Sequence, residues 1–172
     1  MMETDWRERL IRRHADLFGL GGYPTVGNGW RELIETALAR IAAAVASVPG
    51  AKVTITQIKE KYGGLRIYFD DSGLSEDAKG RVEEAIDLAE YRAACTCEHC
   101  GAEGQLYDNH GWYITRCEAH AEGDPVPAAP GRKNLRIRRM LVGGELRIVA
   151  AHRYDRARDA FIEIPTAVLE DD

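Results

Sequence analysis

The sequence predicts an α+β protein in which helices pack on a small antiparallel sheet, followed by a zinc-ribbon-like hairpin and a β-rich C-terminal segment. Three observations lead to this fold class. Helical and strand-like repeats of apolar residues alternate early in the chain, four cysteines cluster in its middle, and basic and apolar residues alternate near its end. The expected divisions are an α+β core at 1–94, a zinc-binding ribbon at 95–121, a Pro-rich linker at 122–131 and the β-rich segment at 132–172.

The composition indicates a folded protein without a membrane partner. Hydrophobic residues make up 45% of the 172 residues, which suffices for a buried core. No stretch approaches the roughly 20 apolar residues of a membrane-spanning helix, and the charged N-terminus lacks the apolar core of a secretory signal. We therefore expect a cytoplasmic protein. In that reducing compartment, clustered cysteines more often bind a metal than form disulfides.

Within the core, the apolar spacing predicts the order helix, helix, hairpin, helix. Apolar residues recur every three or four positions in three stretches, as the buried stripe of a helix requires. Asn28 or Gly29 is positioned to cap the second helix, and Ser75 the third. A β-branched run and a run in which Leu65, Ile67 and Phe69 alternate with other residues meet near Gly63-Gly64, which is typical of a hairpin turn. The predicted helices span 4–18, 29–48 and 76–94, and the predicted strands span 52–59 and 65–69.

The cysteine cluster predicts one zinc ion held by Cys97, Cys100, Cys117 and His120. The first two ligands form a Cys-x-x-Cys pair followed by Gly101, the last two form a Cys-x-x-His pair, and sixteen residues separate the pairs. Each tight turn directs two ligand atoms at one ion, and two such turns complete a tetrahedron. The intervening residues predict a short hairpin. Four protein ligands leave no open coordination position, so the predicted zinc is structural rather than catalytic.

One ligand has an alternative. Cys95 forms a Cys-x-Cys pair with Cys97 and would complete an all-thiolate site in place of His120. His120 is favoured because it makes the second pair mirror the first, and because Cys95 lies near the end of the preceding helix. We expect His99 to point away from the ion and His110 to lie at the tip of the hairpin.

The C-terminal segment predicts a further hairpin and a third strand. Residues 135–142 and 146–151 flank Gly143-Gly144, a tight-turn sequence, and residues 160–164 follow a polar turn. Residues 130–158 hold nine Lys/Arg against two acidic residues, a balance of +7, whereas residues 1–129 carry −7. We interpret these arginines first as a solvated strand face. A nucleic-acid partner for residues 132–158 is the alternative.

The chain resembles a family of small bacterial and phage or prophage proteins with an Ile-Lys-Glu-Lys-Tyr-Gly-Gly-Leu-Arg motif. The matching residues span 27–120: Gly27-Asn-Gly-Trp30, then Gln57 through Tyr68 with that motif, then Cys-x-x-Cys-Gly, and finally Trp112-Tyr-Ile-Thr-Arg-Cys-x-x-His. The resemblance implies a zinc-containing accessory protein and no particular reaction. It also suggests a specific role, in which a phage-encoded protein binds and inhibits a host defence complex.

These observations predict a non-enzymatic, zinc-containing protein that binds a protein or a protein–nucleic acid complex. A nucleic-acid-binding zinc-ribbon protein is the alternative. The less favoured hypothesis is a metal-dependent His-Asn-His nuclease, because Asp108, Asn109 and His110 follow the first cysteine pair. Only six residues separate His110 from Cys117, which leaves no room for the helix that supplies the second metal-binding histidine of such enzymes. We interpret Asp108–Gly111 as a turn.

Overall fold

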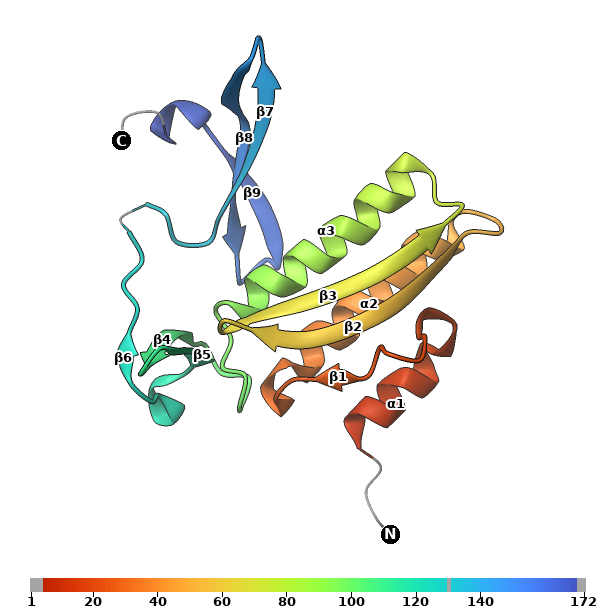
Figure 1. Ribbon diagram of the computed structural model, residues 1–172, viewed down its shortest axis with the longest axis horizontal. Helices are drawn as coiled ribbons and strands as arrows, with labels where there is room; N and C mark the ends of the chain where they lie inside the picture. Colours follow the sequence, from red (N-terminus) through yellow and green to blue (C-terminus); the bar gives the residue numbers. More distant parts are fainter. Residues whose placement is uncertain (1–4, 130, 170–172) are drawn as a thin grey trace. The chain divides into compact units, whose positions relative to one another are not determined.

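The computed structural model describes residues 5–129 and 131–169 and divides into two compact units, residues 1–126 and 127–172 (Figure 1). Residue 4 of the first predicted helix, residue 130 of the predicted linker and the acidic residues 170–172 lie outside the described residues. Within the described ranges, the chain forms three α-helices and three sheets of three strands, which confirms the α+β class. No helix in these ranges is long and apolar enough to cross a membrane.

The three predicted helical stretches contain α1 (Trp6–Arg13), α2 (Arg31–Ala46) and α3 (Glu76–Ala93). α3 begins as predicted, because the hydroxyl of Ser75 accepts a 3.2 Å hydrogen bond from the N–H of Ala78. α1 is shorter than predicted. The chain turns into a 3₁₀ helix at Ala15–Leu17, and Phe18 then forms a parallel bridge with Ile55 of the sheet, which a longer helix would prevent.

The predicted cap of α2 is wrong. A 3₁₀ turn at Asn28–Trp30 precedes the helix, and Trp30 occupies the N-cap position without a side-chain hydrogen bond. The side-chain oxygen of Asn28 instead accepts a 2.9 Å hydrogen bond from the indole N–H of Trp6. The backbone at Gly27 and Gly29 is held by the cysteine-bearing turn described below, which is why this segment is not shaped as a helix cap.

The sheet of the first unit has the strand order β1–β2–β3. β2 (Lys52–Lys61) and β3 (Gly64–Ser72) form the predicted hairpin, whereas β1 (Pro24–Thr25) is a parallel edge strand that the sequence did not predict. The turn residues Tyr62 and Gly63 both have positive φ angles, 53° and 76°. Two such residues give the tight hairpin turn whose twist matches that of the flanking strands.

Helices α2 and α3 cover one face of this sheet (Figure 1). A bulge between Ile55 and Gln57 shifts the alternation of β2, so that Ile55 and Ile58 are both buried. The apolar stripes predicted for the helices and strands therefore meet in one core. Its fully buried members include Trp30, Ile34, Leu38, Ile41, Ile55, Ile58, Leu65 and Val82.

A second small sheet carries the cysteine-rich segment and has the order β5–β4–β6. The predicted hairpin is formed by β4 (Gln105–Asn109) and β5 (Trp112–Arg116). β6 (Asp124–Pro125) pairs with β4, so the first residues of the predicted linker belong to this sheet. The side chain of Asp108 accepts a 2.6 Å hydrogen bond from the N–H of Gly111, which closes the predicted turn.

The second unit is a three-stranded antiparallel meander. β7 (Leu135–Val142) and β8 (Glu145–Asp155) meet at the predicted Gly143-Gly144 turn, and β9 (Ala160–Ile164) pairs with the far end of β8. A 3₁₀ helix at residues 166–169 follows. β8 is longer than predicted because residues 151–155 pair with β9, and a bulge interrupts its register opposite Arg138 and Arg139.

Candidate metal centre

The first cysteine pair lies on a tight turn after α3. The N–H of Gly101 donates a 2.8 Å hydrogen bond to the carbonyl of Cys97, and the N–H of Cys97 donates one of the same length to the carbonyl of Ala102. Gly101 has a φ angle of +82°, a conformation that residues with a side chain rarely adopt. The turn places the thiols of Cys97 and Cys100 within one group of ligand atoms.

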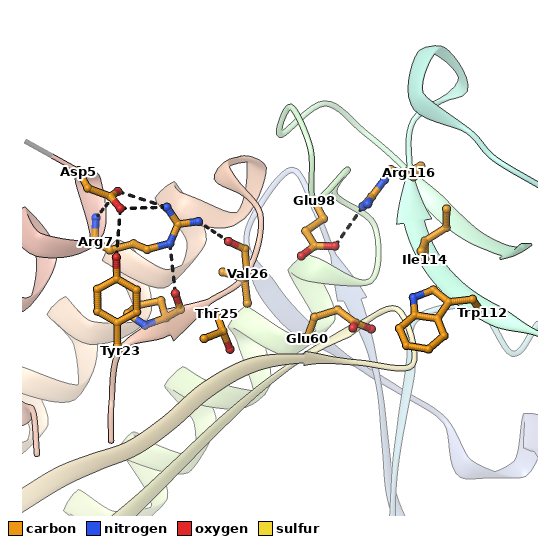
Figure 2. Close-up of a pocket in the computed structure, with 11 residues that line it drawn as sticks. Asp5, Arg7, Tyr23, Thr25, Val26, Glu60, Glu98, Trp112, Ile114 and Arg116 are labelled. Carbon is orange, nitrogen blue, oxygen red and sulfur yellow. Dashed lines mark hydrogen bonds and ion pairs between the residues drawn. The ribbon is translucent and has the colours of Figure 1, made fainter. Parts of the chain in front are cut away.

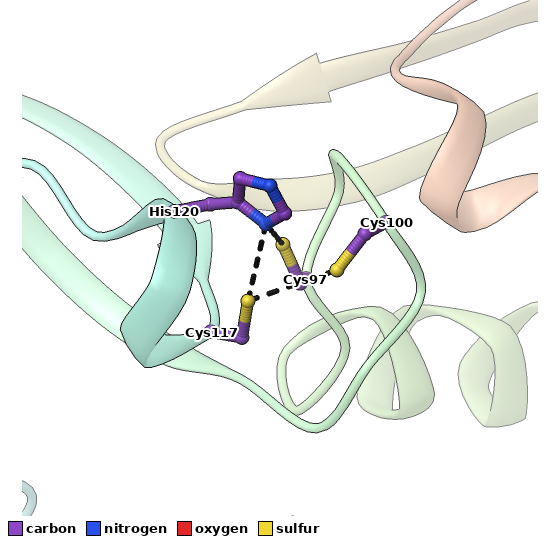
Figure 3. Close-up of side chains that lie close together, drawn as sticks. All are labelled: Cys97, Cys100, Cys117 and His120. Carbon is purple, nitrogen blue, oxygen red and sulfur yellow. Dashed lines mark hydrogen bonds between the residues drawn. The ribbon is translucent and has the colours of Figure 1, made fainter.

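The second pair lies on a single 3₁₀ turn, Glu118–His120, that follows β5. The N–H of His120 donates a 3.1 Å hydrogen bond to the carbonyl of Cys117, which returns the imidazole toward the preceding thiol. The Nδ1 atom of His120 then lies 3.2 Å from the sulfur of Cys117 and 3.8 Å from the sulfur of Cys97 (Figure 3).

These four side chains fit a tetrahedral metal ion. Their ligand atoms all lie within 4.8 Å of one another, and the sulfurs of Cys100 and Cys117 are 3.7 Å apart. A tetrahedral ion with metal–sulfur bonds of about 2.3 Å requires sulfur–sulfur separations of about 3.8 Å. The group Cys97, Cys100, Cys117 and His120 is therefore positioned to bind a metal.

The close packing of the group shifts the pKa values of two of its thiols. Burial acts to raise the pKa of Cys97, but the backbone N–H groups of Cys117, Cys100 and His99 outweigh it and lower this pKa to about 6. The pKa of Cys100 is raised, because desolvation and the neighbouring thiols outweigh the N–H of Ala102, which acts to lower it. The thiolate of Cys97 therefore forms readily, and its charge disfavours a second thiolate at Cys100. A bound cation would remove this repulsion.

The neighbouring residues that the sequence raised as alternatives lie outside this group. Cys95 is buried at the end of α3, where its thiol is 3.3 Å from the carbonyl of Arg92. His99 was expected to point away, but its ring centroid lies 4.2 Å from that of His120, so it packs beside a ligand. His110 occupies the β4–β5 turn with a φ angle of 54°.

Hydrogen bonds and an ion pair of Glu98 connect the first cysteine turn with the rest of the first unit. One carboxylate oxygen accepts a 2.8 Å hydrogen bond from the N–H of Gly27, and the other lies 3.1 Å from the guanidinium of Arg116 on β5. The backbone carbonyl of Glu98 accepts a 2.7 Å hydrogen bond from the N–H of Gly29. Glu98 therefore connects both halves of the metal group with the segment that precedes α2.

Sequence reasoning missed the role of the Gly27–Trp30 segment. A Cβ atom on Gly29 would collide with the carbonyl of Cys97 and the N–H of Gly101, so only glycine allows the cysteine turn to lie this close. The indole of Trp30 donates a 2.8 Å hydrogen bond to the carbonyl of Thr96, and its ring is fully buried. The two glycines before Trp30 could have indicated this close approach, but we interpreted Gly29 as a possible helix cap.

An open groove of about 550 Å³ lies beside Glu98 and Arg116 (Figure 2). One wall contains Trp112 of β5, whose side chain is 70% exposed, and the ion pair between Glu98 and Arg116. Glu60 of β2 forms part of the floor, and its carboxylate accepts a 2.6 Å hydrogen bond from the N–H of Gly63. The opposite wall comes from residues near the N-terminus, Asp5, Arg7 and Tyr23–Val26.

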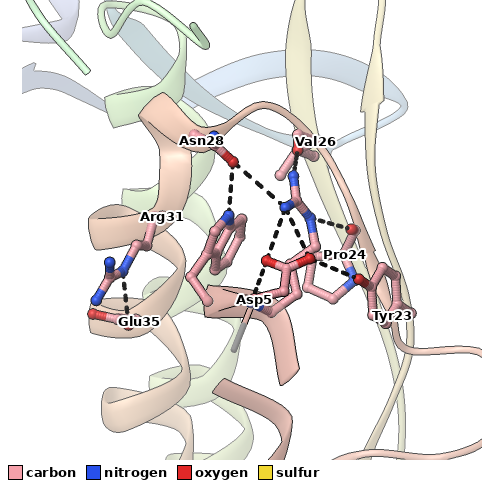
Figure 4. Close-up of polar contacts among 9 residues, drawn as sticks. Asp5, Tyr23, Pro24, Val26, Asn28, Arg31 and Glu35 are labelled. Atoms are coloured by element: carbon pink, nitrogen blue, oxygen red, sulfur yellow. Dashed lines mark hydrogen bonds and ion pairs between the residues drawn. The ribbon is translucent and has the colours of Figure 1, made fainter. Parts of the chain in front are cut away.

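Arg7 organises that opposite wall (Figure 4). Its guanidinium donates hydrogen bonds to the carbonyls of Pro24 and Val26, and it forms a 3.2 Å ion pair with Asp5. Pro24 belongs to the edge strand β1, and Val26 follows this strand directly. Arg7 therefore satisfies two backbone acceptors at this end of the sheet.

Comparisons of the chain with protein-family models, with curated proteins and with solved structures each returned no match.

Proposed function

We propose that this chain is a non-enzymatic binding protein and that its metal is a structural zinc ion. Three thiolates and one imidazole are the donor set that zinc prefers, and four protein ligands leave no position for a reacting water. The metal group lies where the cysteine turn, the β4–β5 hairpin and the start of α2 converge. Its proposed task is to hold these elements in place.

The proposal rests on exposed aromatic side chains of two hairpins, which the zinc ion would help to hold in place. The Tyr62 side chain on the β2–β3 turn is 73% exposed, and the Trp112 side chain at the start of β5 is 70% exposed. The two hairpins are tied together by the hydrogen bond from Thr115 to the carbonyl of Gly63. Tyrosine and tryptophan supply most of the energetic anchors of protein interfaces, and folding gains little from leaving them in water. We call Tyr62 and Trp112 the aromatic pair.

A protein is the partner that this surface favours. Residues 1–129 carry a balance of −7. In the groove beside Trp112, Asp5 and Glu98 are paired with Arg7 and Arg116, which leaves the carboxylate of Glu60 as the excess charge. A nucleic-acid backbone would be repelled by this charge. Together with the resemblance of residues 27–120 to phage and prophage proteins, this favours an accessory protein that binds a host protein complex. Inhibition of a host defence complex is the specific form of the proposal.

Capture from bacterial lysate tests the proposal. The tagged full-length chain is compared with a Tyr62→Ser/Trp112→Ser variant and with Leu20→Ser, which removes another fully exposed apolar side chain. We expect a protein that is captured by the parent and by Leu20→Ser, is lost with the aromatic pair, and persists after nuclease treatment. Equal capture by all three chains, or capture that nuclease abolishes, would contradict a protein-binding role for this surface.

A further inference from the structure

In the second unit, the tip of the β7–β8 hairpin extends beyond the third strand, β9, as a two-stranded ribbon. β9 pairs only with Ala151–Asp155 of β8, whereas β7 and β8 remain paired as far as Val142 and Glu145. The part beyond β9, in which Arg138–Val142 pairs with Glu145–Ala150, stands free of the third strand (Figure 1). At about 3.4 Å per residue, this ribbon is roughly 17 Å long.

The stem of the ribbon is basic. The register places Arg138 and Arg147 as diagonal neighbours on one face, and Arg139 lies on the other face. Arg147 has an ion pair with Glu145 at 3.0 Å, but neither Arg138 nor Arg139 forms an ion pair with a described residue. Fixed positive charge thus flanks the ribbon on both faces and is only partly neutralised.

The tip of the ribbon is apolar and exposed. Leu141 and Leu146 lie directly opposite each other, and their side chains are 73% and 67% exposed. Met140 and Val142 are also exposed, at 54% and 45%. Side chains of this size contribute nothing to the core of the unit from these positions, and exposed apolar clusters usually mark a binding site.

We propose that the β7–β8 ribbon is an arm that binds double-stranded DNA by entering a groove. Two strands about 4.8 Å apart, with their side chains, match the major groove, which is about 12 Å wide. From that position the arginines reach the phosphates on both sides of the groove. The apolar tip contacts base edges and thymine methyl groups at the floor of the groove.

Duplex DNA fits the ribbon better than a single strand. Proteins that bind single strands stack the bases on aromatic rings, and residues 135–150 contain no aromatic residue. Residues 1–129 carry a balance of −7 and repel the DNA backbone, whereas residues 130–158 carry +7 and attract it. DNA contact is therefore confined to the second unit, and it does not involve the aromatic pair of the first.

Fluorescence anisotropy with the full-length chain tests the arm. The probes are a labelled mixed-sequence duplex of about 20 base pairs and one of its strands, titrated between about 50 and 200 mM NaCl. We expect tighter binding to the duplex, with an affinity that falls as salt rises. Removing two phosphate contacts in Arg138→Gln/Arg139→Gln is expected to reduce the slope of log K against log salt by about 2, and to weaken binding at low salt on the order of tenfold or more.

Two further variants test whether DNA binding depends on the arm itself rather than on the net charge of the chain or on its folding. Arg12→Gln/Arg31→Gln removes the same charge from exposed ion pairs of the first unit and is expected to leave DNA binding within about twofold. Leu141→Ser/Leu146→Ser is expected to weaken binding while leaving the salt slope unchanged, because it removes no charge. Circular dichroism and gel filtration confirm that each variant remains folded.

Four results would overturn the DNA-binding arm. They are an absence of duplex binding at the lowest salt, tighter binding to the single strand, equal losses in the Arg12/Arg31 control, and displacement of the duplex by polyglutamate at equal charge concentration. The last result would make the ribbon a general site for acidic polymers, including acidic proteins. Loss of the Tyr62 and Trp112 side chains should leave duplex binding unchanged, so failure of the proposed protein interface and failure of the arm are distinguishable.

Discussion

The hydroxyl of Thr115 donates a 2.6 Å hydrogen bond to the carbonyl of Gly63, and both residues are buried. Thr115 lies two residues before the candidate metal ligand Cys117, and Gly63 forms the turn of the β2–β3 hairpin. A Cβ atom on Gly63 would also collide with the side chain of Leu106 on β4. The two hairpins therefore behave as one body, and the metal group is held by the sheet of the first unit as well as by its own turns.

Removal of the Thr115 hydroxyl should loosen this junction. Thr115→Val keeps the shape of the side chain but leaves the buried carbonyl of Gly63 without that donor, which is expected to cost about 1–3 kcal/mol in the free energy of unfolding. Urea denaturation measures the change. Thr36→Val is the matched control, because its exposed hydroxyl bonds only within α2. Equal small effects at the two positions would show that the junction contributes little.

The contact between Gly29 and the cysteine turn gives a second prediction. Gly29→Ala forces a methyl group against the carbonyl of Cys97, so the turn has to move away from α2. We expect a loss of about 1–3 kcal/mol in the free energy of unfolding, and metal affinity lower by about 10- to 100-fold. Thermal denaturation and competition with a chromophoric chelator measure the two effects.

Gly80→Ala is the control for the Gly29 substitution. Gly80 lies within α3, and a Cβ atom there would meet nothing within 4 Å. The same chemical change should therefore raise the free energy of unfolding by about 0.5–1 kcal/mol through helix propensity, without altering metal affinity. If Gly29→Ala behaved in the same way, the close approach of the cysteine turn to α2 would not be required.

How far the sequence predicts this structure differs between elements. The β2–β3 and β7–β8 hairpins and the helices α2 and α3 were predictable, because apolar periodicity and turn residues are local signals. β1 was not, since two residues have no periodicity and pair only through the distant Ile58 and Lys59. α1 was predicted too long because a tertiary contact, from Phe18 to Ile55, ends the helical run.

The candidate site divides in the same way. The spacing of the two pairs alone predicted that Cys97, Cys100, Cys117 and His120 form one group, because a tight turn brings both members of a pair together whatever surrounds them. The role of Glu98 depends on Gly27 and Arg116, which are remote in sequence and meet only in the folded chain. The groove beside Trp112 likewise joins five separate segments of the chain, and no local sequence pattern predicts it.

His14 gives a prediction about pH. Burial of its ring, aided by the charge of Arg13 and opposed by Glu35, lowers the pKa of His14 in the folded state. Below the ordinary pKa of about 6.5, the unfolded chain binds a proton that the folded chain resists. The free energy of unfolding should therefore fall as the pH drops through this value.

His14→Gln should flatten that part of the pH dependence, since glutamine does not titrate. Urea midpoints measured at several values between about pH 7 and 5 test the point. His110→Gln is the control for the substitution itself, because His110 lies in the exposed β4–β5 turn. Parallel curves for the parent and His14→Gln would show that His14 titrates alike in the folded and unfolded chains.

Metal content and thermal midpoint, measured on the same chains, decide whether Cys97, Cys100, Cys117 and His120 bind one structural zinc ion. Elemental analysis of the purified chain should find one zinc ion per chain, retained in Cys95→Ala and lost in Cys117→Ser. A strong chelator should lower the melting temperature of the parent by about 10 °C or more, because metal binding contributes directly to folding. Zinc retained in Cys117→Ser, zinc lost in Cys95→Ala, or a melting temperature unchanged by the chelator would contradict the claim.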